Sequence, residues 1–106
     1  MHPGLRRMLT QSVRVQRQDG ASDYGDPAWG AMSDPIPARI EPTTKIVMAP
    51  MGGQAFQAEI LVIIESGIQP EDRVWLPGRT EPRTARSVFE VPEALSDRID
   101  HLEVYL

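Results

Sequence analysis

Side chains alternate between apolar and polar along residues 54–65. A repeat of two residues places the apolar side chains on one face of a β-strand, whereas a helix needs a repeat of 3.6. We therefore expect the longest strand of a β-rich protein here. Leu61 and Ile63 add apolar residues to the opposite face, which a second sheet or a second subunit must then cover. The first face comprises Phe56, Ala58, Ile60, Val62 and Ile64.

Other short alternating segments are separated by Gly and Pro residues, which interrupt regular structure. Three prolines at positions 35, 37 and 42 lack the N–H that a strand ladder needs, so the strand around them should lie at an edge or a bend. The turn at residues 49–53 should join that strand and its continuation to the longest strand as a hairpin. The expected strands are 12–18, 36–40 with 44–48, 54–65, 73–76, 84–91 and 99–106.

These elements predict a single all-β domain over residues 1–106, in the form of a small closed β-barrel or sandwich of five to six strands. Residues 19–35 contain repeated Gly, Asp and Pro and no sustained period, so we expect a long loop after the first strand. This loop and residues 1–11 would be extensions of the barrel. Residues 92–97 are expected to form at most one short helical turn.

Charge is distributed unevenly along the 106 residues, which carry a net charge of -4. Residues 1–18 contain four arginines and no acid, whereas residues 19–34 contain four aspartates and no base. The acidic total argues against general binding to a phosphate backbone, and the opposite charges would suit head-to-tail stacking of copies. Because the chain has no cysteine and no long apolar run, we expect a protein of a reducing interior that is neither secreted nor membrane-bound.

The sequence shows no pattern typical of a catalytic or metal site. His2 and His101 have no partner spacing, and the aspartates at 19, 23 and 26 lack the register of a calcium loop. Glu71 and Asp72 are interpreted as a solvated turn. We therefore expect no enzyme activity, no metal and no cofactor.

Aromatic residues are the clearest candidates for an interface. Trp29, which shares the long loop with Tyr24, should either fold back as a lid on the core or project into a partner. On its expected strand Trp75 points to the face opposite that of the residues before and after it. It could therefore join Leu61 and Ile63 in a second apolar surface.

Five segments together resemble the head-closure (stopper) or head-tail joining proteins of tailed bacteriophages. Each segment is a piece of strand or turn, and their order along nearly the whole chain carries the resemblance. Residues 92–98 look more helix-prone than the hairpin turn that the family pattern would place there. The segments are TQSVRVQR at 10–17, DYGDPAWG at 23–30, IPARIEP at 36–42, IQPEDRVWLPG at 68–78 and HLEVYL at 101–106.

The resemblance implies a structural virion protein, assembled in the host cytoplasm, that forms a ring in the phage neck. Such a ring would lie between the portal and adaptor on one side and the tail terminator or tail on the other. It would close the head, retain packaged DNA, which passes through the lumen without sequence-specific contact, and offer the docking surface for the tail. A ring of identical subunits also needs two different, complementary surfaces on each copy.

We expect the long loop to contact the neighbouring ring and the 49–53 turn to close the channel. The interface residues would be Arg6, Arg7, Tyr24, Asp26, Trp29, Leu61, Ile63 and Trp75. The channel loop would comprise Met48, Pro50, Met51, Gly52 and Gly53.

Two alternatives compete with this interpretation. The chain could be another neck component, although adaptors are expected to be mainly helical and terminators to have an α/β arrangement. It could also be a small nucleic-acid-binding barrel, which would need an aromatic and basic platform on one face. In the sequence the aromatic residues are scattered and the bases cluster near the N-terminus, which disfavours this second alternative.

Overall fold

The computed structural model describes residues 3–21, 25, 27–48, 54–93 and 98–106 and is nearly all β, which confirms the predicted fold class. Within these residues there are eleven short strands and one helical turn. The helix is α1 (Pro3–Arg6). The strands are β1 (Gln11–Gln16), β2 (Gln18–Ala21), β3 (Pro27–Trp29), β4 (Ile36–Pro42), β5 (Ile46–Met48), β6 (Ala55–Gln57), β7 (Ile60–Ile64), β8 (Arg73–Trp75), β9 (Arg83–Thr84), β10 (Ser87–Pro92) and β11 (Ile99–Tyr105).

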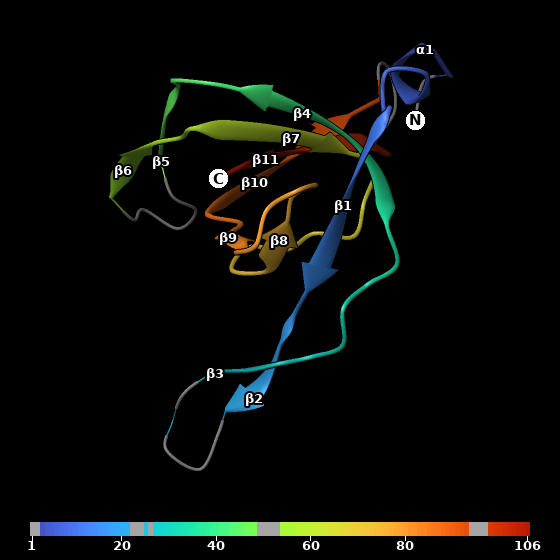
Figure 1. The fold of residues 1–106 in the computed structure, drawn as a ribbon. Coiled ribbons are helices and arrows are strands. Elements are labelled where there is room, and N and C mark those ends of the chain that lie inside the picture. Colours follow the sequence, from blue (N-terminus) through green and yellow to red (C-terminus); the bar gives the residue numbers. More distant parts are fainter. Residues whose placement is uncertain (1–2, 22–24, 26, 49–53, 94–97) are drawn as a thin grey trace.

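Seven strands form one antiparallel sheet in the order β10-β11-β7-β4-β1-β8-β9, and this sheet curls into a half-barrel (Figure 1). The predicted closed barrel or sandwich of five to six strands is wrong in closure and in strand count. Among the described residues, no ladder joins the terminal strands β9 and β10. The chain passes from one sheet end to the other through Ala85 and Arg86, and β9 is only two residues long, so this connection takes the place of a closing ladder.

The first strand bridges the two halves of the sheet. Residues 11–13 of β1 pair with β4, and residues 14–16 pair with β8. Val13 and Val15 point inward, as the alternation predicts. They join a core that β7, β8 and β11 also line. The buried members are Val13, Val15, Ala38, Val62, Ile64, Ile68, Val74, Leu76, Ala85, Leu102, Val104 and Leu106.

Strand β4 lies inside the sheet, between β7 and β1, so the prediction of an edge position is wrong. The Ile40 N–H donates to the Gln11 Oε1 at 2.9 Å, which shows that even-numbered N–H groups of β4 face β1. The nitrogen of Pro37 therefore faces β7, whose pairing begins only at residue 38. The nitrogen of Pro42 faces β1, beyond the start of that strand. Both prolines thus occupy positions where no ladder bond is lost.

The expected hairpin is present, but its second arm is two strands and not one. β5 pairs with β6, and β4 pairs with β7. Between β6 and β7, the Ala58 N–H donates to the Lys45 carbonyl at 2.9 Å and the Glu59 N–H to the Leu106 carbonyl at 3.0 Å. The chain changes partners at this point, and the strand is interrupted there. The expected strand at 84–91 is likewise divided into β9 and β10.

A second, smaller apolar cluster lies on the outer side of the sheet. Tyr105 pairs with Leu61 in the ladder between β11 and β7, and the β5–β6 hairpin packs against both. The apolar second face at Leu61 is therefore covered by the chain's own hairpin, and no second sheet or subunit is needed there. The buried members are Val47, Phe56, Ala58 and Tyr105.

Residues 19–35 do not form the expected loop without strands, because β2 and β3 pair as a two-stranded extension. This extension projects from the half-barrel and contributes to the long dimension of a molecule measuring 47 × 32 × 27 Å (Figure 1). The returning chain follows β1, where the Gly30 N–H donates to the Arg17 carbonyl at 2.8 Å and the Ser33 N–H to the Val15 carbonyl at 2.9 Å. Of the helical turn expected at 92–97, residues 94–97 lie outside the described residues.

Candidate interaction surfaces

The outer face of β1 and β8 gathers both tryptophans of the chain. Val15 and Val74 point into the core from these strands, so the neighbouring residues point outward. The outward residues lie opposite one another in two register pairs, Arg14 with Trp75 and Gln16 with Arg73. We call this surface the Trp–Arg face; it comprises Arg14, Gln16, Trp29, Arg73, Trp75 and the adjoining Arg79.

Specific contacts hold both indole rings on this face. The Arg73 guanidinium carbon lies 4.0 Å from the centroid of the Trp29 ring, a cation–π contact. The Trp75 Nε1 donates to the Gln16 Oε1 at 2.9 Å, and the Gln16 Nε2 donates to the Gly30 carbonyl at 3.3 Å. Trp29 thus folds back, but against the outside of β8 and not as a lid on the core.

A shallow groove of about 260 Å³ adjoins the Trp–Arg face. Arg14, Trp75 and Arg79 line it together with Met32, and none of its lining residues is acidic. Neither Arg14 nor Arg79 forms an ion pair with any residue that the structure describes. The groove therefore offers apolar area beside two arginines that are free to pair with a partner's carboxylates.

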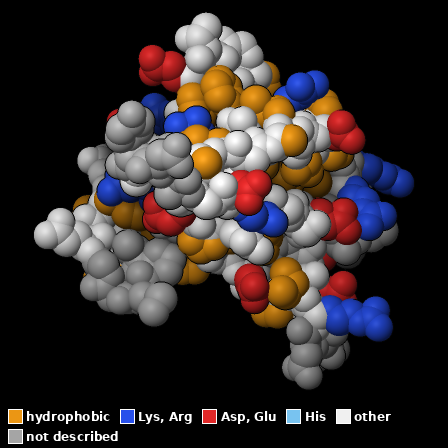
Figure 2. Space-filling view, turned by 90° about the horizontal axis from the view of Figure 1, so that it is seen from below, with side chains coloured by type: hydrophobic (Ala, Val, Ile, Leu, Met, Phe, Trp, Pro, Cys, Tyr) orange, Lys and Arg blue, Asp and Glu red, His pale blue; other side chains and the backbone are white. Residues whose placement is uncertain are grey.

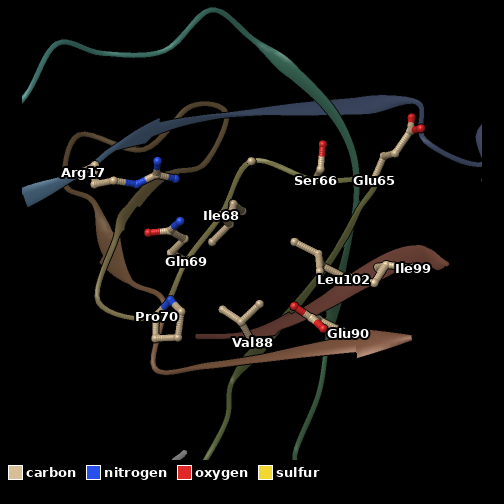
Figure 3. Close-up of a pocket in the computed structure, with 11 residues that line it drawn as sticks. Arg17, Glu65, Ser66, Ile68, Gln69, Pro70, Val88, Glu90, Ile99 and Leu102 are labelled. Atoms are coloured by element: carbon tan, nitrogen blue, oxygen red, sulfur yellow. The ribbon is translucent and has the colours of Figure 1, made fainter. Parts of the chain in front are cut away.

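The open end of the half-barrel forms a second candidate surface, a cleft of about 730 Å³ that we call the mouth cleft (Figure 3). Ile68, Val88 and Leu102 point into it from three different parts of the chain (Figure 3). The complete lining is Arg17, Glu65, Ser66, Gly67, Ile68, Gln69, Pro70, Val88, Glu90, Ile99 and Leu102.

The charged groups of the mouth cleft differ in whether they are already paired. Glu65 pairs with Arg6 at 3.1 Å, and its carboxylate points outward in Figure 3. Arg17 pairs with Asp72 at 3.4 Å. Glu90 is exposed and has no ion pair within the part of the chain that the structure describes. The cleft therefore combines an apolar floor with one carboxylate that lacks a counterion.

Asp72 is a buried residue and not part of a solvated turn, so that interpretation of Glu71 and Asp72 is wrong for Asp72. Its side chain is 3% exposed and accepts the Gln69 N–H at 2.8 Å and two contacts from the Arg17 guanidinium at 3.4 Å. Asp72 fixes the loop before β8. Sequence spacing gave no sign of its burial, because its partner Arg17 is distant in sequence.

The structure separates Trp75 from Leu61 and Ile63. Strands β4 and β1 lie between β7 and β8 in the sheet, so the three residues do not form the single apolar surface expected from the sequence. Leu61 packs on the outer cluster. Ile63 lies half-buried between Arg39 and Glu103 in the ladder.

The remaining predicted interface and channel residues are divided between described and undescribed parts of the chain. Arg6, in α1, is held by Glu65, and Arg7 is exposed beside it. Met48, at the end of β5, is 60% exposed. The residues outside the described part are Tyr24, Asp26, Pro50, Met51, Gly52 and Gly53.

His101 belongs to a polar network on β11. Its Nδ1 lies 2.6 Å from an Asp100 carboxylate oxygen, and its side chain is 15% exposed. On the same strand the Tyr105 hydroxyl donates to Glu103 at 3.3 Å. Among the described residues, no group of three histidine or acidic side chains could hold a metal ion.

Hydrophobic side chains reach the surface at several separate places, with acidic and basic side chains between them (Figure 2). No helix among the described residues is long and apolar enough to span a membrane. Comparison with models of known protein families gives no match, and comparison with curated proteins gives none either. The case for a function therefore rests on the residues and surfaces of this chain.

Proposed function

We propose that this chain is a structural subunit of a tailed-phage neck, forming a ring between the portal or adaptor and the tail that closes the head and retains DNA. The proposal rests on one observation: two hairpins, β2–β3 and β5–β6, extend from the small half-barrel. The β5–β6 hairpin has large apolar side chains exposed to solvent. A body with such extensions suits an assembly in which copies contact each other and their neighbours. The resemblance of five ordered segments to head-closure proteins adds to this argument.

The β5–β6 hairpin is our candidate for the lumen. Val47 and Phe56 on one of its faces pack against the body, and the Arg86 guanidinium carbon lies 3.9 Å from the Phe56 ring centroid. On the other face Ile46 and Met48 are 72% and 60% exposed. Large apolar side chains in such exposed positions are typical of surfaces that a partner covers. The hairpin would present them to the channel.

The β2–β3 extension is our candidate for docking to the neighbouring ring, because it projects away from the half-barrel (Figure 1). In the sequence Tyr24 and Asp26 fall between β2 and β3, and both are outside the described residues. The net charge of -4 fits a channel through which DNA must pass without being held by its phosphates.

Self-association of the purified full chain tests the proposal. We expect analytical ultracentrifugation to detect a closed oligomer at high protein concentration, and negative-stain electron microscopy to reveal annular particles. The variant Ile46→Ser/Met48→Ser should still form the ring, because in this proposal these side chains meet only their counterparts across the lumen and the contacts that close the ring lie elsewhere. A chain that remains monomeric up to millimolar concentration would overturn the proposal.

Nucleic-acid binding is a second candidate function, because one premise against it is wrong. The two tryptophans are not scattered in space, since Trp29 and Trp75 share a face with Arg14 and Arg73. Such a surface could stack bases and contact phosphates. If it does, fluorescence anisotropy should detect binding of oligothymidylate at low salt, with affinity that falls steeply as salt rises and is lost in Trp75→Ala. No binding at low salt eliminates this candidate.

A further inference from the structure

The two candidate surfaces lie on opposite faces of the main sheet. Val88 and Leu102 of the mouth cleft belong to or pack against the core, so the cleft opens from the inner, concave face. Arg14 and Trp75 alternate with core residues of β1 and β8, so the Trp–Arg face is on the outer side. The cleft involves β10 and β11 at one end of the sheet order, and the Trp–Arg face lies near the other end.

The chemistry of the two surfaces is complementary. The mouth cleft has an apolar floor, to which Ile99 contributes with 48% exposure, and the unpaired carboxylate of Glu90 (Figure 3). The groove of the Trp–Arg face presents apolar side chains, Met32 and Trp75, beside the unpaired Arg14. An apolar cleft with one unpaired carboxylate suits an apolar side chain flanked by a cation, and the groove supplies this combination.

We propose that the Trp–Arg face of one copy docks against the mouth cleft of a second copy, with Glu90 accepting hydrogen bonds from Arg14 or Arg79. This inference rests on the proposed function and specifies which two surfaces meet within the ring. Because the surfaces differ and face opposite ways, the contact is head-to-tail and not two-fold symmetric. Repetition of such a contact gives a closed ring when a whole number of copies completes one full rotation.

The choice of a second copy as the occupant follows from charge. The free arginines and the free carboxylate occur on the same chain, so identical copies supply both partners. Within a single copy, no described residue forms an ion pair with the side chain of Arg14, Arg79 or Glu90. Each surface therefore keeps its charge available for the neighbour.

Charge reversal in trans tests the pairing of the two surfaces. We expect Arg14→Glu and Glu90→Arg each to weaken self-association by roughly tenfold or more, because each places like charges opposite one another. An equimolar mixture of the two variants should assemble close to wild type, because alternating copies restore opposite charges at every contact. Ultracentrifugation of each variant and of the mixture measures this.

Two control variants change the charge equally outside both surfaces. Arg86→Glu and Glu71→Arg alter exposed residues that line neither the groove nor the mouth cleft, and they should assemble like wild type. Thermal unfolding followed by circular dichroism should give wild-type midpoints for Arg14→Glu and Glu90→Arg, which separates weak association from misfolding.

The outcomes distinguish this inference from the proposed function. If wild type forms rings and the two variants assemble equally well, or if the mixture fails to restore assembly, the pairing of these surfaces is wrong while the ring stands. An equal loss in the control variants also overturns the pairing. If wild type itself never associates, both the ring and the pairing fail.

Discussion

At the scale of single residues, Asp72 shows how one side chain can fix a loop. Its carboxylate is buried and accepts the Gln69 N–H at 2.8 Å, while Arg17 approaches from a position that is 53% exposed. A buried acceptor that loses its donors, or a buried donor that loses its acceptor, raises the free energy of the folded state. The backbone bond at Gln69 should therefore contribute more than the solvent-screened ion pair with Arg17.

We expect Asp72→Ala to lower the free energy of unfolding by about 2 kcal/mol, because it leaves the Gln69 N–H without its acceptor. Asp72→Asn keeps an acceptor oxygen at this position and should lose less than about 1 kcal/mol. Urea denaturation followed by tryptophan fluorescence measures both. Equal losses in the two variants would indicate that the ion pair with Arg17, and not the backbone bond, dominates.

Gly67 and Gly78 both adopt positive φ angles, of 100° and 72°, but their surroundings differ. A Cβ at Gly67 would lie 3.3 Å from the Ile36 Cδ1, whereas a Cβ at Gly78 would meet nothing within 4 Å. Alanine should cost about 1–2 kcal/mol at either position for its backbone conformation. We expect thermal denaturation to give the larger loss for Gly67→Ala, and a larger loss for Gly78→Ala would contradict the crowding at Ile36.

At the scale of elements, the β5–β6 hairpin has two faces with different tasks. Val47 and Phe56 cover the outer cluster around Tyr105, while Ile46 and Met48 remain in solvent. The alternation of a strand makes this division possible, because adjacent residues point to opposite sides. One short hairpin can therefore stabilise the body and present an apolar surface at the same time.

We expect Val47→Ala to destabilise the protein by about 1–2 kcal/mol, because it removes buried methyl groups from the outer cluster. Ile46→Ala, one residue away, should change stability by less than about 0.5 kcal/mol because its side chain is already in water. Guanidinium denaturation of both variants measures the difference. A larger loss for Ile46→Ala than for Val47→Ala would show that the hairpin packs through the opposite face.

At the scale of the whole molecule, the order of strands decides which side chains share a surface. The sheet places Trp75 beside Arg14 but puts two strands, β1 and β4, between it and Ile63. It also separates the Trp–Arg face from the mouth cleft, so that one copy carries two unlike surfaces. This arrangement is the requirement for a head-to-tail ring.

The outer face of β7 allows a test of which of its two apolar side chains supports folding. Leu61→Asp should destabilise the monomer by about 2 kcal/mol, because it places a carboxylate against the outer cluster. Ile63→Asp should cost less than about 1 kcal/mol, because Ile63 belongs to neither buried cluster. Chemical denaturation of both variants measures this, and unfolding of Ile63→Asp would place that residue in the core.

The alternating pattern of short segments determined that the chain is all-β, that Val13 and Val15 point inward, and that residues 36–48 and 54–65 form a hairpin. These features follow from sequence because they depend on the geometry of a single strand and of neighbouring segments. The same reasoning overestimated strand length and closure, because a strand ends where the chain changes partners.

Only the tertiary structure decided which strands became neighbours. Trp29, Arg73 and Trp75 share a face because the chain after β3 returns along β1 and β1 pairs with β8. Asp72 is buried because Arg17 and Gln69 converge on it. Pairing between distant strands depends on the sum of contacts across the whole sheet. A local sequence pattern does not specify these long-range contacts. Only the tertiary structure therefore reveals the Trp–Arg face, the mouth cleft and the absence of a ladder between β9 and β10.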